Sequence, residues 1–343
     1  MEKKKITIDD IARDLGISKT TVSRAISGKG RIGKSTVDRV MAYIEQQHYH
    51  PSAIAKSLAK SRSYNIAFVM SAEYGETDLP FFQKCMWGVS DYISNYGYDV
   101  IYCLVSGDDI SQLQRLIRDQ KIDGAIFGRT TLEDEALAYL KSHDIPFVTV
   151  GTLDDDEVIQ VDNDHTKGCH DLTAKLLEGG MKKPAILGGD MKYIVNKKRY
   201  EGFESALRDY KKKADKKLSF FNLKTPEDIE KAVEDALFGK TDCIVCMDDN
   251  ICIHAINYLH RKNIKIPEDV KIASFYDSMF LENHQPPVSA LLIDIKELGA
   301  KCGEAVIACI NKETAELSSG KQAAMKTDLL ECKVMMKEST GNI

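Results

Sequence analysis

From residue 63 onward the chain alternates short apolar runs with amphipathic stretches, and this alternation limits the possible fold more than any other feature. The runs expected to form strands are 65–70, 99–105, 124–127, 147–150, 159–161, 184–187, 218–221, 243–247 and 270–275. The stretches expected to form helices are 82–96, 110–120, 132–143, 167–178, 198–210, 226–238 and 250–262. Apolar strands joined by helices form parallel sheets that are covered on both faces. We therefore predict an α/β core of doubly wound parallel sheets.

The strands fall into two series, which predicts two lobes. We place the N-lobe at about 63–162 and 293–323, and the C-lobe at about 163–292 and 324–343. In doubly wound sheets, ligands bind beyond the carboxyl ends of the strands. Two such edges that face each other would form a cleft able to close on a small molecule.

The first 47 residues follow a different pattern, that of three short amphipathic helices. Apolar residues recur at spacings of three and four, as in Ile8, Ile11, Ala12 and Leu15; Val22, Ala25 and Ile26; and Val37, Val40, Met41 and Ile44. The step between the first two helices is residues 15–18 (LGIS), a tight turn followed by a capping serine. Helix, glycine-containing turn and helix is the helix-turn-helix plan of DNA-binding proteins. We therefore predict an all-α DNA-binding domain at 1–49, a hinge helix and linker at 50–62, and the two-lobed α/β core at 63–343.

Charge is divided unevenly along the chain. The whole sequence has a formal net charge of −5, which alone argues against a nucleic-acid partner. Residues 1–63, however, hold 13 Lys and Arg against 6 Asp and Glu, a net charge of +7, so the remainder carries −12. A basic head on an acidic body fits phosphate contact at one end only.

Several other classes of protein are disfavoured. The N-terminus is charged and no apolar run is long enough for a membrane span, so we expect a cytoplasmic protein without a membrane partner. The nine cysteines lie mostly in apolar runs, and the pair Cys243 and Cys246 belongs to an apparent buried strand. We therefore expect reduced thiols, no metal and no cofactor. No phosphate-binding or nucleophile-elbow motif occurs, so we expect no enzyme. His165 and His170 lie five residues apart and are interpreted as a helix-start residue and a surface residue.

The chain resembles the LacI/GalR family of bacterial transcription regulators along essentially its whole length. The longest matches are residues 6–12 (ITIDDIA), residues 16–24 (GISKTTVSR) and residues 49–58 (YHPSAIAKSL). Looser matches are residues 80–82 (PFF), 161–163 (VDN), 199–203 (RYEGF) and 286–287 (PP). The resemblance implies a periplasmic-binding-protein-like core, a homodimer, double-stranded operator DNA as partner and a small-molecule effector. It leaves open whether the effector is an inducer or a corepressor.

The DNA side can be read residue by residue. Lys19 and Thr20 begin the expected recognition helix, whose side chains reach base edges in the major groove. Arg24, one turn further, is long enough for a guanine edge or a phosphate. Hydroxyl side chains that can contact phosphates are Thr7, Ser18, Thr21, Ser23 and Ser35. Arg31 matches a DNA-contact position of the family, whereas Val22 and Ala25 are expected in the core.

The hinge covers residues 51–58, which are too few for a stable isolated helix. We expect this helix to form only when a partner chain and DNA are present. In the family, two such hinges pair in the minor groove and a leucine from each opens the central base step. The resemblance assigns that role to Leu58, with Ala55 and Lys56 in register. The alternative is that Leu58 is an ordinary apolar linker residue.

The effector side departs from the family in places. Phe81 and Phe82 match an aromatic pair that lines the family's cleft, although at least one of them is expected in the core. Arg199 matches an arginine that grips effector hydroxyls or a carboxylate, and its alternative partner is Asp248. Met247 stands before Asp248 where the family commonly has asparagine, and Tyr276 stands where it has an effector-binding aspartate.

The remaining candidates for effector contact are Asp277, Asp249 and Lys224. Asp277 follows Tyr276 and Asp249 follows Asp248, while Lys224 would add positive charge toward an anionic ligand. We expect a DNA-binding transcriptional repressor whose effector is related to carbohydrates. The alternatives are control by a partner protein or by a non-sugar ligand such as a nucleobase or a sugar phosphate.

Overall fold

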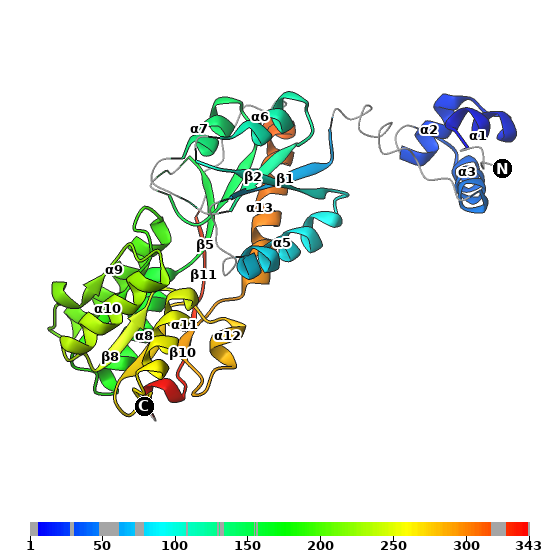
Figure 1. The fold of residues 1–343 in the computed structure, drawn as a ribbon. Coiled ribbons are helices and arrows are strands. Elements are labelled where there is room, and N and C mark those ends of the chain that lie inside the picture. The colour runs from blue at the N-terminus through cyan, green and yellow to red at the C-terminus, as the bar shows by residue number, and fades with distance from the viewer. Residues whose placement is uncertain are drawn as a thin grey trace. The chain divides into compact units, whose positions relative to one another are not determined.

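The computed structural model describes residues 6–27, 31–47, 62–72, 79–107, 109–128, 130, 134–153, 155, 157–316 and 327–341. The chain divides into two compact units, Met1–Arg62 and Ser63–Ile343, and each is described by itself. Figure 1 shows the elements of both units.

The first unit contains the three helices that the periodicity predicted. They are α1 (Ile8–Leu15), α2 (Lys19–Ser27) and α3 (Lys34–Gln46). Thr7 caps the start of α1 in a capping box. The Thr7 hydroxyl accepts a hydrogen bond from the backbone N–H of Asp10, and the Asp10 carboxylate accepts one from the backbone N–H of Thr7. Gly16 ends α1 in the left-handed region, with φ of 67°, which permits the tight turn into α2. Ile11, Val22 and Val40 are fully buried between the helices and hold them together.

The N-lobe of the second unit contains a six-stranded sheet in the order β11-β5-β4-β3-β1-β2. Its strands are β1 (Asn65–Ser71), β2 (Asp99–Val105), β3 (Gly124–Phe127), β4 (Phe147–Val150), β5 (Ile159–Asn163) and β11 (Asp328–Leu330), all parallel. Its helices are α5 (Leu79–Ser94), α6 (Ser111–Arg118), α7 (Glu135–Ser142) and α13 (Ile295–Glu316). Along β1, Ile66 and Phe68 join the core under α5 and α13, while Ala67 and Val69 join the core under α6 and α7. Burial on both faces explains why β1 is apolar throughout.

The C-lobe repeats the plan with a sheet in the order β12-β10-β9-β8-β6-β7. Its strands are β6 (Pro184–Leu187), β7 (Ser219–Phe220), β8 (Cys243–Cys246), β9 (Lys271–Ser274), β10 (Ser289–Leu292) and β12 (Lys333–Met335). Its helices are α8 (His165–Glu178), α9 (Ile194–Asp209), α10 (Pro226–Phe238), α11 (Asp249–Arg261) and α12 (Met279–Glu282). β12 runs antiparallel to β10, and the other pairs are parallel. The expected two-lobed, doubly wound architecture is confirmed.

The lobes are joined by three crossings of the chain. β5 leads into α8, β10 leads into α13, and β11 leads into β12. The last crossing falls between Leu330 and Lys333, because β11 pairs with β5 in the N-lobe sheet. The boundary that the sequence placed at 323/324 is therefore corrected to a later position.

Helices α5 and α13 lie side by side at a distance set by glycines (Figure 1). A Cβ atom on Gly88 would lie 2.0 Å from the Lys296 carbonyl oxygen, and one on Gly299 would lie 2.0 Å from the Cys85 carbonyl oxygen. Each glycine is thus in contact with the backbone of the facing helix, and no larger residue fits without separating the two helices.

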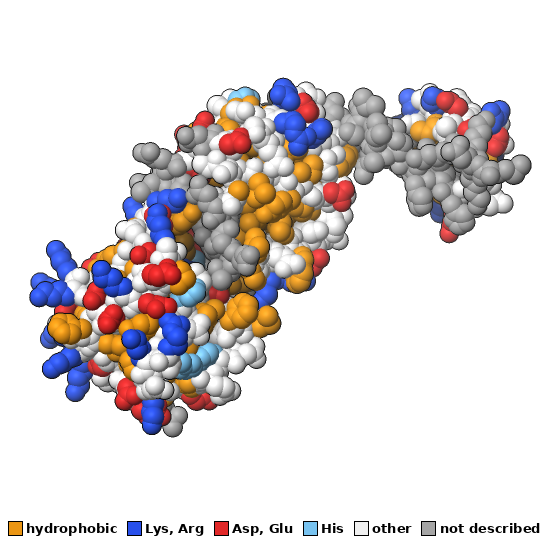
Figure 2. Space-filling model, viewed as in Figure 1, with side chains coloured by type: hydrophobic (Ala, Val, Ile, Leu, Met, Phe, Trp, Pro, Cys, Tyr) orange, Lys and Arg blue, Asp and Glu red, His pale blue; other side chains and the backbone are white. Residues whose placement is uncertain are grey.

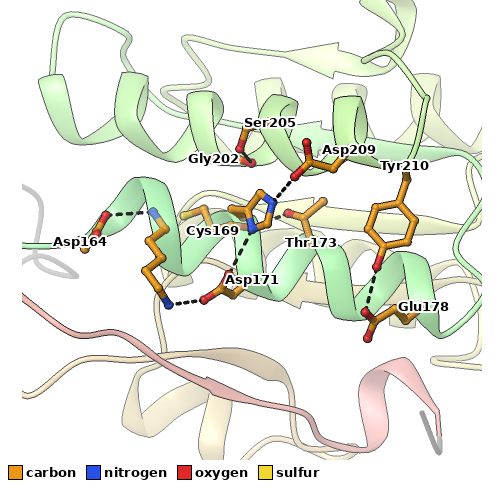
Figure 3. A network of polar contacts seen from close by, with 11 residues as sticks. Asp164, Cys169, Asp171, Thr173, Glu178, Gly202, Ser205, Asp209 and Tyr210 are labelled. Carbon is orange, nitrogen blue, oxygen red and sulfur yellow. Dashed lines mark hydrogen bonds and ion pairs between the residues drawn. The ribbon is translucent and has the colours of Figure 1, made fainter.

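Helices α8 and α9 are linked by polar contacts at their exposed edge (Figure 3). The His170 ring on α8 lies between two carboxylates, with Nδ1 3.1 Å from Asp171 and Nε2 2.9 Å from Asp209 on α9. These hydrogen bonds, to Asp209 first and then to Asp171, raise the pKa of His170 above its ordinary value. Tyr210, just after α9, also donates to Glu178 at the end of α8.

Candidate functional site

The first of two separate candidate sites is the exposed face of α2 in the first unit. Ser18 caps this helix by accepting from the backbone N–H of Thr21 at 3.0 Å. Val22 and Ala25 are buried, as expected, so the remaining side chains face outward: Lys19, Thr20, Ser23 and Arg24 are exposed and Thr21 is partly exposed. The helix therefore presents two cations and several hydroxyls on one surface.

Some of the predicted phosphate-contacting hydroxyls already have partners within the unit. The Thr7 hydroxyl bonds to Asp10 at 2.7 Å, and the Ser18 and Thr21 hydroxyls bond to each other at 2.8 Å. Lys19 Nζ lies 3.0 Å from Asp9, but both side chains are solvent-exposed and such pairs are weak. Arg31 and Ser35 are exposed near the start of α3. Three predicted DNA-contacting residues of the hinge, Ala55, Lys56 and Leu58, lie outside the described residues.

The second candidate site is a cavity of about 200 Å³ between the lobes of the core, within the second unit. Its walls follow the carboxyl ends of the strands, as doubly wound sheets predict. The N-lobe contributes Phe81, Gly128, Thr130, Val150, Gly151 and Asp162, and Ile293 lies at a crossing. The C-lobe contributes His165, Gly189, Asp190, Tyr193, Val195, Asn196, Arg199, Asp248, Asp249, Asn250 and Tyr276.

Four of the predicted effector residues are brought together at this cavity. They are Phe81, Arg199, Asp248 and Tyr276. The Phe81 and Tyr276 rings meet edge to face with centroids 6.2 Å apart, so aromatic surface from both lobes meets at the cavity. Arg199 is only 9 % exposed, and its Nε has no hydrogen-bond partner.

Three other predicted effector residues are placed elsewhere, and their assignment is corrected. Phe82 is fully buried in the N-lobe core, because it points to the inner face of α5 while Phe81 does not. Asp277 is buried in an ion pair with Lys337, whose Nζ lies 2.8 Å away. The Lys224 side chain is 67 % exposed and lies 3.5 Å from Asp190, so it reaches a residue of the wall without lining the cavity.

Sequence reasoning did not name several residues of the wall, among them the acidic Asp162 and Asp190, whereas Asp248 and Asp249 were candidates. Asp162 is the penultimate residue of β5, and its carboxylate accepts hydrogen bonds from the backbone N–H groups of Thr152 and Asn163. Asp248 caps α11 by accepting from Ile251 at 2.9 Å. Burial, with the neighbouring Asp248 charge, raises the pKa of Asp249 to about 6. A carboxylate directly after an apolar strand was the available signal for Asp162.

His165 was also missed, since a histidine at a helix start has no distinctive sequence signal. It is 6 % exposed and lines the cavity, with Nε2 3.3 Å from Asp162 Oδ1. Its other ring nitrogen, Nδ1, is buried without a hydrogen-bond partner. A buried polar atom without a partner is unusual in a folded protein and points to an absent ligand or water.

The cysteines take no part in this site. All nine are buried, and burial raises the pKa of Cys85 and of Cys332 to about 12. Cys243 and Cys246 lie in β8, as the apolar pattern indicated. Among the described residues, no group of three or more His, Cys, Asp or Glu is arranged to hold a metal ion. None of the described helices is long and apolar enough to cross a membrane.

Two family models match the chain, one for each unit. Residues 7–52 match "Bacterial regulatory proteins, lacI family", and residues 66–323 match "Periplasmic binding proteins and sugar binding domain of LacI family". The second match alone covers more than half of the chain.

Curated relatives match over nearly their full length. The transcriptional regulator MalR of Staphylococcus xylosus is 30 % identical over 88 % of this chain and 90 % of its own. The transcriptional regulator RegA of Clostridium saccharobutylicum is 27 % identical over 90 % of this chain and 93 % of its own. Both are transcriptional regulators by name.

Solved structures share the fold. The lac repressor dimer bound to operator and an anti-inducer superposes with a TM-score of 0.79, at 17 % identity, over 99 % of this chain and 100 % of that chain. A complex of the transcriptional regulator CelR with cellobiose has a TM-score of 0.71, at 23 % identity, over 97 % of this chain and 99 % of that chain.

Proposed function

The chain belongs to the LacI family of bacterial regulatory proteins and is a DNA-binding transcriptional regulator. From this premise we propose that a small neutral carbohydrate, bound between the two lobes of the core, controls the affinity of the protein for operator DNA. The observation that carries this proposal is the cavity, which combines aromatic side chains with hydrogen-bonding groups from both lobes. Aromatic faces pack against the C–H face of a sugar, while Asp and Arg bind its hydroxyls. A ligand that touches both lobes would favour one arrangement of the lobes over another.

The charge of the wall supports a neutral ligand over an anionic one. Among the described lining residues, four carboxylates face one arginine: Asp162, Asp190, Asp248 and Asp249 against Arg199. A sugar phosphate would bring two further negative charges among these carboxylates, and like charges in a partly desolvated site repel strongly. Hydroxyl groups, by contrast, can donate to every carboxylate that remains ionised. The match of the core to a family model of sugar-binding domains and its likeness to the complex of CelR with cellobiose support the same class of ligand.

For the DNA side, we propose that Lys19, Thr20 and Arg24 contact base edges and that the hydroxyls of Ser23, Thr21 and Thr7 contact phosphates. The exposed face of α2 supports this assignment. The minor-groove role of Leu58, with Ala55 and Lys56, remains a prediction from the family's pattern.

We propose that the regulator acts as a homodimer through the apolar surface of its core. Large apolar side chains are exposed on α5, on β2 and in the turn between them, namely Trp87, Tyr102, Leu104 and, in the turn, Tyr96. Figure 2 shows hydrophobic side chains gathered over this part of the N-lobe. β2 is also an edge strand of its sheet. A contiguous apolar surface of this kind is typical of a protein–protein interface, and two copies would present two DNA-reading heads to a palindromic operator.

A regulator that reads chromosomal DNA acts in the cytoplasm, and we propose that location. We also propose that the cavity binds its ligand without turnover. The relatives that support this are regulators rather than enzymes.

The effector class can be tested by thermal unfolding of the full chain with single ligands. The panel is D-glucose, D-galactose, D-ribose, maltose and cellobiose, with glucose 6-phosphate, ribose 5-phosphate, adenine and guanine as alternatives. At least one neutral sugar should raise the Tm in a concentration-dependent way, because a ligand that binds only the folded state stabilises it. A shift with a phosphate or a purine and with no neutral sugar would contradict the proposal.

The base-reading residues can be tested by selecting DNA from a random pool with the wild type and with Lys19→Ala and Thr20→Ala. Loss of one base contact is expected to relax the consensus at one position of each half-site, at about 1–3 kcal/mol of discrimination. Ser35→Ala, near the start of α3, serves as the matched control and should weaken binding equally for all sequences. An unchanged consensus for both α2 variants would show that the residues at the start of α2 do not contact base edges.

A further inference from the structure

His165 is the first residue of α8 and lies at the crossing from the N-lobe to the C-lobe. Asp164 caps the helix by accepting from Lys167, so the position of the His165 backbone is fixed from both sides. The side chain lies at the wall of the effector cavity, together with Asp162 and Arg199. A polar side chain so deeply buried requires a reason, because burial without hydrogen bonds is costly.

The two ring nitrogens of His165 have different surroundings. Nε2 lies 3.3 Å from Asp162 Oδ1. A carboxylate can only accept, so the tautomer that suits this contact has its proton on Nε2, and in that tautomer Nδ1 holds a lone pair. Asp162 is itself held by the backbone N–H groups of Thr152 and Asn163, which keeps its carboxylate directed at the ring.

The lone pair on Nδ1 has no donor within the protein. In the same cavity, Arg199 Nε is a donor without an acceptor. One is an acceptor and the other a donor, and both are deeply buried. A sugar hydroxyl both donates and accepts, so hydroxyls of a bound sugar suit both atoms.

We propose that His165 determines effector specificity by accepting a hydrogen bond at Nδ1 from a hydroxyl of the bound sugar, with Asp162 as the positioning residue that sets the ring's tautomer. This inference rests on the proposed function and deepens it, since it names the polar group that the effector must present. A ligand that lacks this donor leaves a buried acceptor unsatisfied, which costs about five- to twenty-fold in affinity. A phosphate dianion offers no donor, so a phosphate group placed at this position would leave Nδ1 unsatisfied.

The two nitrogens can be tested separately by amide substitutions in the full chain. His165→Gln places an amide nitrogen near the position of Nε2 and keeps the contact with Asp162, but it removes the Nδ1 acceptor. His165→Asn places its amide oxygen near the position of Nδ1. The matched control is His170→Gln, a change to another histidine of α8 that lies outside the cavity wall.

Binding is measured by calorimetry with the neutral sugar of the panel that gives the largest Tm shift and with its mono-deoxy derivatives. We expect the wild type to lose about five- to twenty-fold in affinity for one derivative, and His165→Gln to lose a similar factor for the parent sugar. His165→Gln should no longer distinguish the parent from that derivative, because each change removes the same hydrogen bond. His165→Asn should restore part of the discrimination, and His170→Gln should match the wild type.

The outcomes separate this inference from the proposed function. If no neutral sugar binds the wild type, the proposed function fails, and the His165 assignment fails with it. Two results would leave the proposed function standing and overturn the His165 assignment. One is that His165→Gln binds the sugar with the same affinity as the wild type does. The other is that His165→Gln still discriminates every deoxy derivative as the wild type does. The comparison of derivatives within the wild type remains decisive even if His165→Gln does not fold: equal affinity for all derivatives overturns the assignment.

Discussion

At the scale of single residues, the cavity is organised by groups whose hydrogen bonds are incomplete. Arg199 brings a buried guanidinium whose Nε has no partner, and His165 brings a ring nitrogen in the same state. By contrast, Asp162 and Asp248 accept bonds from the backbone at strand and helix ends. Residues with satisfied bonds therefore fix the walls, and residues with unsatisfied bonds remain for the ligand.

Arg199→Ala should remove the sugar-induced rise in Tm, because the variant loses the donor that faces the cavity. A single charged hydrogen bond is worth about 1.5–3 kcal/mol, so the loss of affinity should be at least about tenfold. Calorimetry with the panel sugar measures it. Arg208→Ala, an exposed arginine near the end of the same helix, is the control and should bind as the wild type does. A normal sugar affinity in Arg199→Ala would place the effector elsewhere.

Part of this site could be predicted from the sequence, and the rest depended on orientation. The family's pattern gave Phe81, Arg199 and Asp248 by position. It could not separate Phe81 from Phe82, since adjacent helical residues point about 100° apart and only packing decides which one is buried. Asp277 had the right residue type at a strand end, but Lys337, 60 residues later, pairs with it.

At the scale of elements, two helix pairs hold the lobes in different ways. α5 and α13 meet through glycines, with backbone against backbone. α8 and α9 also approach closely, since a Cβ on Gly202 would lie 2.4 Å from the Thr166 carbonyl oxygen, and they add the polar network around His170. We therefore expect the packing of α5 on α13 to depend on side-chain volume, and the packing of α8 on α9 to depend on both side-chain volume and pH.

Gly299→Ala should lower the free energy of unfolding by roughly 1–3 kcal/mol. Alanine favours a helix over glycine by about 1 kcal/mol, so helix propensity alone predicts the opposite sign. We expect the clash with the Cys85 carbonyl oxygen to outweigh the gain in helix propensity, because the backbone of a packed helix cannot move aside. Urea denaturation measures the change, and Glu297→Ala, exposed on the same helix, should alter stability by less than about 0.5 kcal/mol. A more stable Gly299→Ala protein would contradict the close packing.

The His170 network should make stability depend on pH. The folded-state pKa of His170 is raised by Asp209 and Asp171, so its contribution is fully present below the unfolded pKa of about 6.5 and is lost as pH rises through the folded pKa. His170→Gln should therefore destabilise the protein more at pH 5.5 than at pH 8.5. Urea midpoints at the two values measure the difference. An equal effect at both values would show that the ring is not charged in its network.

The elements themselves were largely predictable where one short apolar run stood between two amphipathic helices. β2, β3, β6, β8 and β9 follow that pattern, while β4 and β5 succeed each other without a helix between them. Burial on both faces explains the apolar runs of central strands such as β3 and β8. The sequence analysis did not identify α13 as a helix, nor β10, β11 and β12 as strands. β11 and β12 are three residues each and lack an apolar run, because their place is set by pairing with β5 and β10 and not by local composition.

At the scale of the whole molecule, the chain joins a helix-turn-helix unit to a two-lobed core that contains the cavity. Three chain crossings connect the lobes, and the effector cavity lies between them beside the first crossing. Any ligand that changes the balance between lobe arrangements also changes DNA affinity if the two are coupled, and the coupling must be equal in both directions. The sign of the response is set by which arrangement the sugar favours.

The central claim is most directly tested by measuring operator affinity as a function of sugar concentration, with an operator chosen from the selected DNA pool. The sugar that stabilises the protein is expected to change the Kd for this DNA by at least about fivefold, and the DNA should change the sugar's Kd by the same factor. Operator affinity that stays constant while the cavity becomes saturated with sugar would contradict the account.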